Sequence, residues 1–282
     1  IIRNNIIKKI LLKYLKRKKN VQLFNNLPLD KISSSNEHIF ANTNRFTFKS
    51  KLIIAADGKQ SHVRSILKTY RYFKKYNHRA LVVNFNHSLN HNNTAYEIFL
   101  ETGPLAILPM MKTKNDLFSS SIIWSNEEKF ISNLEKLNKN LLIAILIEQV
   151  GKYVGDIKEI VDIQSFNLSA HINTKFYDQR LIYIGDSAHS IHPIAGQGWN
   201  LGVRDVKNLL EVLENAKRLG LDLGNSFTCK QYHDKSFYDS LILYQITDKF
   251  NSVFLDEKNI SKALRDIGFT FIEKNKKLKN FI

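Results

Sequence analysis

The feature that most constrains the fold is the stretch 185–201, because it joins two elements of different type. Four apolar residues, 181–184, run into Gly185-Asp186, and apolar residues at helical spacing follow over 201–219. The apolar run predicts a buried strand, and the later spacing predicts a helix. A strand, loop and helix in this order are typical of an open α/β sheet, in which ligands dock at the carboxyl ends of the strands. Asp186 is therefore placed to accept hydrogen bonds from a ligand.

The loop after Asp186 is rich in residues with special backbone properties. Pro193 stiffens it, since the proline ring fixes φ and removes an N–H group. Gly196 and Gly198 carry no Cβ, so the backbone can come close to a flat ligand there. The helix that begins after Gly198 offers unpaired N–H groups and a partial positive charge, which suit an anionic group.

Three other interpretations of the stretch are weaker. His189 and His192 have the spacing of a metal-binding pair, but no third ligand lies nearby and Pro193 argues against a helix. Asp186, Ser187 and His189 are too close in sequence to form a nucleophilic triad. An ordinary glycine-containing turn would not need so many special residues. We therefore expect a cofactor site and no metal site.

A second apolar run, 52–56, also ends in a turn pair, Asp57-Gly58, and a helix is expected from about Ser61 to a point before Arg71. The remaining chain predicts further strands and helices. The expected strands are 21–24, 40–48, 81–85, 95–100, 105–109, 118–124 and 163–169, and the expected helices are 6–17, 127–150 and 227–254. The strands between 79 and 124 predict an antiparallel sheet inserted between the parallel-sheet elements.

Three stretches resemble motifs of one family. The sequence Gly-Asp-Ser-Ala-His-Ser-Ile-His-Pro-Ile-Ala-Gly-Gln-Gly-Trp-Asn-Leu-Gly-Val-Arg-Asp-Val, residues 185–206, resembles the second flavin-contact motif of the ubiquinone-biosynthesis hydroxylases. These are group A flavoprotein monooxygenases with a fold like that of para-hydroxybenzoate hydroxylase. Ala-Asp-Gly at 56–58 with Ser-His-Val-Arg at 61–64 is similar to another family motif, and 103–109 is similar to the substrate-domain segment. The family usually has Phe or Leu where this chain has Trp199.

The resemblance implies an α/β fold with four parts. A FAD-binding parallel-sheet domain, incomplete at its amino end, would occupy 1–75 and 163–220. An antiparallel-sheet α+β substrate domain would be inserted at 76–162, and a carboxyl-terminal helical region would follow at 221–282. The family's amino-terminal Gly-x-Gly-x-x-Gly motif, which holds the ADP half of FAD, is absent from this sequence. We therefore expect a partial gene product whose FAD binding is weak or absent in isolation.

The resemblance also assigns roles to individual residues. Asp186 would bind the ribityl chain of FAD, and Pro193 would lie against the edge of the isoalloxazine ring. The N–H groups near Gly198 and Trp199 would face flavin N1 and O2. Asp57, Gly58 and Arg64 would lie near the pyrophosphate and the approach route of NAD(P)H. The cofactor-binding set also includes Gly185, Gly196, Gln197 and Asn200.

The function implied is an FAD-dependent monooxygenase that hydroxylates the ring of a polyprenylated phenol or quinone precursor, using NAD(P)H and O2. Two alternatives stay open: a hydroxylase of a soluble aromatic acid on the same fold, and an inactive fragment. The sequence identifies no catalytic base in the substrate domain. His78, His87 and His91 are candidates only by residue type, and we interpret them as surface histidines.

Charge and cysteine content bear on partners and location. The net charge is +16, but the basic residues are spread along the chain and their clusters are not interleaved with aromatic residues, so we expect no nucleic-acid partner. A lipid-tailed substrate is compatible with peripheral membrane contact, through the basic tail at 274–279 and the aromatic helix 227–254, and with a complex of quinone-biosynthesis proteins. The single Cys229 favours a cytoplasmic location. The lipid-tailed substrate adds the expectation of peripheral attachment at the inner face of the membrane.

Overall fold

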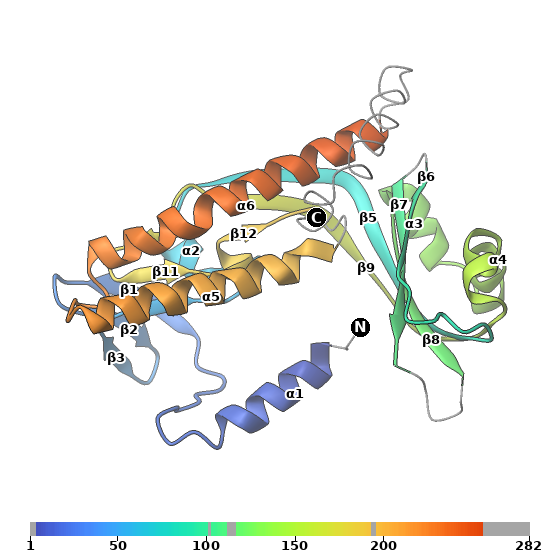
Figure 1. Ribbon diagram of the computed structural model, residues 1–282. Helices are drawn as coiled ribbons and strands as arrows, with labels where there is room; N and C mark the ends of the chain where they lie inside the picture. The colour runs from blue at the N-terminus through green and yellow to red at the C-terminus, as the bar shows by residue number, and fades with distance from the viewer. Residues whose placement is uncertain (1–3, 101–102, 112–116, 193–195, 256–282) are drawn as a thin grey trace. The chain divides into compact units, whose positions relative to one another are not determined.

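The computed structural model describes residues 4–100, 103–111, 117–192 and 196–255, with side chains as far as residue 249. The chain divides into two compact units (Figure 1). Unit 1 comprises Ile1–Leu12, Tyr76–Leu168 and Lys249–Ile282, and unit 2 comprises Lys13–Lys75 and Ser169–Asp248. The predicted class, a parallel-sheet region with an inserted antiparallel sheet and carboxyl-terminal helices, is confirmed by this arrangement.

Unit 2 contains the parallel strand pair that the sequence predicts. Strand β11 (Leu181–Tyr183) runs parallel to β4 (Ile53–Ala55), with Leu181 opposite Ile53 and Tyr183 opposite Ala55. The short strand β10 (Tyr177–Asp178) pairs with the other side of β11 in the antiparallel sense. All three residues of β11 are buried, but the second residue of β4, Ile54, is 44% exposed, so the expectation of a wholly buried strand is wrong at that position.

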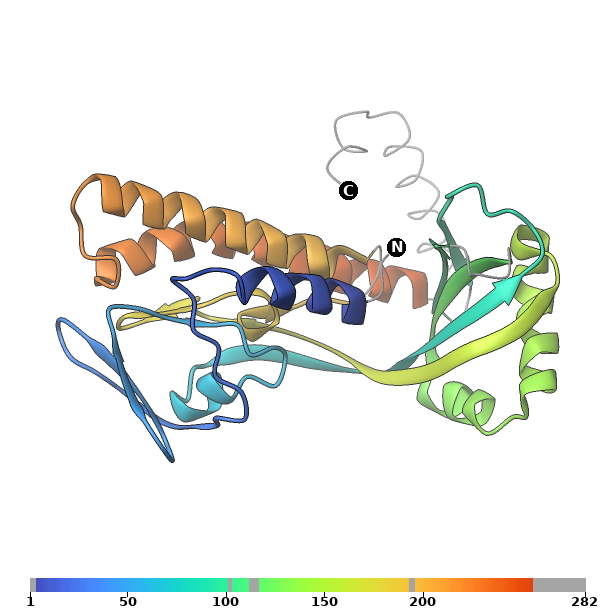
Figure 2. The ribbon, with the colours of Figure 1, turned by 90° about the horizontal axis from the view of Figure 1, so that it is seen from below.

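The other elements of unit 2 surround this pair. Strands β1 (Leu29–Ser34), β2 (Ile39–Thr43) and β3 (Thr47–Ser50) form an antiparallel sheet. A short helix, α2 (His62–Ile66), follows β4, and the 3-10 turn η1 (Gly185–Ser187) follows β11. Helices α5 (Gln197–Arg218) and α6 (Ser226–Leu255) run beside one another in opposite directions (Figures 1 and 2).

The core of unit 2 forms where the strand pair meets these helices. Its buried side chains come from β1, β2, β4, β11, α2, α5 and α6 and from residues 172, 176 and 188, so the helices pack against the strands. The members are Ile32, Ile39, Ala55, Val63, Ile172, Phe176, Leu181, Ile182, Tyr183, Ala188, Leu209, Val212, Cys229 and Tyr232. The helix predicted over 201–219 is present as α5, but three of the apolar residues in the predicted pattern, Val203, Val206 and Leu210, are exposed. The buried face carries Leu201, Leu209 and Val212 instead.

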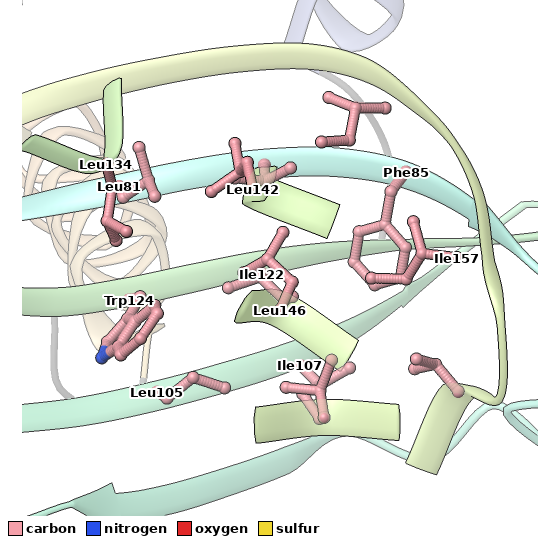
Figure 3. Packing of buried hydrophobic residues seen from close by; sticks show 14 of the residues in the cluster. Leu81, Phe85, Leu105, Ile107, Ile122, Trp124, Leu134, Leu142, Leu146 and Ile157 are labelled. Carbon is pink, nitrogen blue, oxygen red and sulfur yellow. The ribbon is translucent and has the colours of Figure 1, made fainter. Parts of the chain in front are cut away.

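A second sheet lies mostly in unit 1 and has the order β12-β9-β5-β8-β7-β6. Its strands are β5 (Arg71–His87), β6 (Tyr96–Leu100), β7 (Gly103–Met110), β8 (Phe118–Glu127), β9 (Ile157–Asn173) and β12 (His189–Ser190). Helices α3 (Glu128–Glu135) and α4 (Lys139–Val154) cover one face (Figure 1). In Figure 3 side chains from these strands, among them Phe85 and Trp124, pack against Leu142 and Leu146 of α4.

Several expected element boundaries change. Residues 21–24 form no strand, and 40–48 is divided between β2 and β3. The helix expected over 127–150 is two helices, because Asn138 caps a new one by accepting the Leu141 N–H at 2.9 Å. Strands β5 and β9 are longer than expected, whereas α1 (Asn4–Leu15) agrees closely with the expected helix. None of the described helices is long and apolar enough to cross a membrane.

Candidate functional site

The parallel pairing of β4 and β11 brings the two sequence motifs together. Because both strands end at the same edge of the sheet, Asp57-Gly58 and Gly185-Asp186 follow neighbouring strand ends. The Ser187 hydroxyl donates to the carbonyl oxygen of Ala55 at 2.7 Å, and the Ile184 N–H donates to the same oxygen at 3.0 Å. These bonds fix the second motif against the first.

The first motif is a capped turn. The Asp57 carboxylate accepts the N–H of Val63 at 3.0 Å, and the Ser61 hydroxyl accepts the N–H of Arg64 at 3.0 Å. Gly58 has a φ of +82°, in the left-handed region that favours glycine. Asp57 therefore stabilises the start of α2, and its side chain also remains exposed at the strand end.

Arg64 links the two motifs from inside unit 2. Its side chain is 6% exposed, and Nη1 donates to the Ser187 carbonyl at 2.9 Å and lies 3.1 Å from His171 Nε2. Nη2 donates to the Lys59 carbonyl at 2.5 Å. Both terminal nitrogens therefore bind protein atoms. A place for Arg64 near the pyrophosphate or NAD(P)H stays a prediction.

The histidine beside Arg64 is held neutral. Burial, together with the nearby Arg64 guanidinium, lowers the pKa of His171 to about 3. Because an arginine only donates, His171 Nε2 accepts the bond from Arg64 and the proton of the neutral ring lies on Nδ1. His171 thus acts as a neutral acceptor that supports the buried arginine.

Asp186 is the exposed carboxylate of the second motif. Lys59 lies close enough to interact with it electrostatically, while its ammonium donates to the Ser169 carbonyl at 2.8 Å. Burial lowers the pKa of Lys59, and the Asp186 carboxylate opposes that shift. An exposed acceptor beside a cation suits a ligand that carries both hydroxyl groups and negative charge.

Four glycines leave room for such a ligand. A Cβ added at Gly58, Gly185, Gly196 or Gly198 would meet no heavy atom within 4 Å. By contrast, a Cβ at Gly224, outside the motifs, would lie 1.9 Å from the Lys51 carbonyl oxygen. The glycines of the motifs are therefore not required by packing within the described part of the chain, and the space beside them is open.

The amino end of α5 completes the arrangement. Gly196 precedes the helix with a φ of +63°, and as a glycine it offers no side chain to cap the first N–H groups. Trp199 is 63% exposed, and the Asn200 amide donates to Gln197 Oε1 at 3.3 Å. These N–H groups and the helix dipole favour an anionic group. Pro193 lies outside the described residues.

The histidines at 78, 87 and 91 correct one interpretation. His87 is fully buried: Nδ1 lies 3.1 Å from the Val154 carbonyl and Nε2 lies 2.9 Å from the Ser120 hydroxyl. His91 is also buried, with Nε2 3.2 Å from the Met110 carbonyl. The interpretation of these two as surface histidines is wrong: His87 lies in β5 opposite Phe118 of β8, and the ring of His91 packs against both. His78 is partly buried.

Sequence reasoning missed the role of Asp205. This buried carboxylate of α5 accepts a hydrogen bond from the Gly185 N–H and another from His189. It occupies the buried face of the helix beside Leu201 and Leu209. The sequence signal for this role is a carboxylate at a position where the helical spacing of Leu201 and Leu209 calls for an apolar residue. Among the described residues, no three His, Cys, Asp or Glu side chains form a metal-binding group.

Comparisons with known proteins show which proteins this chain is similar to. The FAD binding domain family matches residues 30–220, which is more than half of the chain. Ubiquinone hydroxylase UbiL of Rhodospirillum rubrum is 32% identical over 233 residues, covering 83% of this chain and 53% of that protein. The 3-demethoxyubiquinol 3-hydroxylase of Escherichia coli is 27% identical over 231 residues, covering 82% and 58%. The chain thus spans about half the length of the curated relatives it matches.

Solved structures show the same fold. The p-nitrophenol 4-monooxygenase PnpA from Pseudomonas putida DLL-E4 superposes with a TM-score of 0.75 over 98% of this chain and 70% of its own, at 17% identity. That identity supports likeness of fold and no more. Because the family model matches residues 30–220, the chain belongs to the FAD binding domain family, and ubiquinone hydroxylases are among the relatives to which it is similar.

Proposed function

We propose that this chain carries the ring-facing part of the FAD site of an aromatic hydroxylase. The observation that carries the proposal is that the exposed Asp186 carboxylate and the amino end of α5 both belong to unit 2, with open space at Gly185, Gly196 and Gly198. Asp186 would accept hydrogen bonds from the ribityl hydroxyls. The N–H groups at Gly198 and Trp199 would face the negatively charged edge of the ring, without any mobile cation.

The chemistry follows from the cofactor class. When bound, FAD supplies the activation of O2 and the transfer of one oxygen atom to an electron-rich phenol. The part left to this chain is to hold the ring, orient it and exclude water. We assign NAD(P)H as the electron donor and propose that it approaches near Asp57, Gly58 and Arg64, where the Asp57 carboxylate lies exposed in the turn after β4.

The substrate proposed is a polyprenylated phenol or quinone precursor of ubiquinone. Support comes from the names of the relatives, which include ubiquinone hydroxylases and the E. coli 3-demethoxyubiquinol 3-hydroxylase. Such a substrate carries a lipid tail, so we also propose a cytoplasmic location with peripheral contact at the inner face of the membrane, and association with other quinone-biosynthesis proteins. The exposed side chains of Tyr238, Ile242 and Ile246 on α6 are the described residues suited to that contact. The basic tail lies outside the described residues.

The test of the substrate is genetic and chemical. Disrupting the gene should cause a prenylated quinone intermediate that lacks one ring hydroxyl to accumulate, as measured by mass spectrometry of extracted lipids. An unchanged lipid profile, together with oxidation of a soluble hydroxybenzoate by the protein, would reject the quinone assignment in favour of a soluble aromatic acid.

The test of the cofactor site uses the purified chain. Equilibrium dialysis against FAD, extended to millimolar concentration, should detect binding that weakens when Asp186 is changed to Asn. A matched control is Asp178→Asn, which alters an exposed carboxylate of β10 in the same sheet. Equal FAD binding by the two variants would contradict the role of Asp186.

A further inference from the structure

A buried carboxylate lies behind the turn that presents Asp186. Asp205 is 1% exposed and sits on the buried face of α5, between Leu201 and Leu209. A carboxylate in such an apolar position is costly unless hydrogen-bond donors surround it. Its donors therefore indicate what the residue does.

Two donors of Asp205 come from either side of Asp186. The Gly185 N–H donates to Asp205 Oδ2 at 2.8 Å, and His189 Nε2 lies 2.7 Å from the same oxygen. Since a carboxylate oxygen only accepts, the histidine is the donor. The chain enters η1 at Gly185 and reaches His189 just after it, so one oxygen holds both ends of the turn.

The turn is held from the opposite side as well. The Ser187 hydroxyl contacts the carbonyl oxygens of Ala55 and Ile184, at 2.7 and 2.8 Å. The ring of His189 packs against Phe176, with centroids 5.4 Å apart. Hydrogen bonds to β4 on one side and to α5 on the other fix the backbone of the turn, so the backbone position from which the Asp186 side chain extends is also fixed.

Asp205 and the amino end of α5 belong to one rigid element. The helix begins at Gln197, so Asp205 lies about 12 Å along the axis from the first turn at the usual rise per residue. A hydrogen bond from Gly185 to Asp205 therefore fixes the distance between the Asp186 turn and the N–H groups at the helix start. Within the described residues, this is the side-chain hydrogen bond that joins Gly185 to α5.

We propose that Asp205 is a positioning residue for the cofactor site: by holding Gly185 and His189, it sets the separation between the Asp186 carboxylate and the amino end of α5. This inference rests on the proposed function, since it concerns the same two groups. Asp205 itself touches no ligand in this scheme. Its effect on FAD is transmitted through the backbone of residues 185–189.

The test compares Asp205→Asn with Asp239→Asn. Asp239 is the matched control, because its carboxylate also joins α5 to the rest of unit 2, through a 2.8 Å ion pair with Arg204, but it does not contact the turn. Two measurements are made on the full chain. Amide hydrogen exchange without FAD reports the order of residues 185–188, and equilibrium dialysis reports FAD affinity.

Asp205→Asn should speed amide exchange at residues 185–188 and weaken FAD binding by about tenfold or more, the loss expected for a hydrogen bond to a charged group. Asp239→Asn should leave both unchanged. His189→Gln keeps the hydrogen bond from Gly185 to Asp205, so its effects on amide exchange and FAD affinity should be intermediate. This variant replaces Asp205→Asn in the test if Asp205→Asn fails to fold. Unaltered exchange in both Asp205→Asn and His189→Gln overturns the proposal, as does unaltered FAD affinity. Failure of the unmodified chain to bind FAD would count against the proposed function instead, and exchange would still decide whether Asp205 holds the turn.

Discussion

Because the space beside Gly198 is open, adding one methyl group there should weaken FAD binding without lowering the stability of the fold. Gly198 is the second residue of α5, and a Cβ built on it meets nothing within 4 Å. Replacing glycine by alanine inside a helix stabilises it by up to about 1 kcal/mol, and roughly half of that is reasonable in a first turn. For a chain of this size, such a gain raises the unfolding temperature by about 1–2 °C.

The same methyl group would enter the space that we assign to the flavin ring. If it displaces the ring from one helix N–H group, FAD affinity should fall by about tenfold, the equivalent of one charge-assisted hydrogen bond. Gly198→Ala should therefore unfold at the same or a slightly higher temperature and yet bind FAD more weakly. Thermal unfolding without FAD and equilibrium dialysis with FAD measure the two effects.

The matched control is Gly151→Ala in α4. It offers a comparable gain in helix propensity, and its Cβ would meet only the flexible Ile147 side chain, at 3.2 Å. This variant should leave FAD affinity unchanged. The reasoning would be refuted if Gly198→Ala lowered the unfolding temperature, since the space would not be free, or if it bound FAD as the unmodified chain does.

Three further predictions concern stability and reactivity. Gly224→Ala places a Cβ 1.9 Å from the Lys51 carbonyl and 2.7 Å from Arg180 Nη1, so it should lower the free energy of unfolding by about 2 kcal/mol or more; an unchanged urea midpoint would contradict this. Burial lowers the pKa of His171 from 6.5 to about 3. Between pH 6.5 and pH 3, therefore, the His171 ring is protonated in the unfolded chain and neutral in the folded chain. The contribution of His171 is complete above pH 6.5 and declines by up to about 1.4 kcal/mol per pH unit as the pH falls toward 3, so urea midpoints of His171→Asn should depend less on pH than those of the unmodified chain. Burial raises the pKa of the Cys229 thiol to about 11, so iodoacetamide should modify it at pH 8 only after unfolding; labelling of the native chain at the rate of the unfolded one would argue against the buried position.

The local part of the site could be predicted from sequence, because its signals lie within short stretches. Each apolar run that ends in a Gly/Asp pair gives a strand and a turn, at β4 and at β11. That these strands are parallel neighbours follows from the α/β pattern. The exposed place of Asp186 and the start of α5 near Gly198 follow from the same local chemistry.

What could not be predicted depends on partners that are distant in sequence. The ends of β5 and β9 are polar and lack the apolar pattern of a strand. They nevertheless continue as strands, because neighbouring strands supply their hydrogen bonds. The buried position of His87 requires Ser120 and Val154. Likewise, Arg64 is drawn inside by the Ser187 carbonyl, which lies far along the chain and which no local pattern reveals.

The division into two units has a consequence for anyone who wishes to study one of them alone. The chain passes between the units at residues 12/13, 75/76, 168/169 and 248/249, and each of these points falls inside a helix or strand: α1, β5, β9 and α6. A shortened polypeptide ending at any of them would sever a regular element in the middle of its hydrogen-bond pattern. Each unit is compact, but neither is encoded by one continuous segment of the chain. An insertion or a fusion partner is therefore better accommodated in a surface turn within one unit than at a point where the chain passes from one unit to the other.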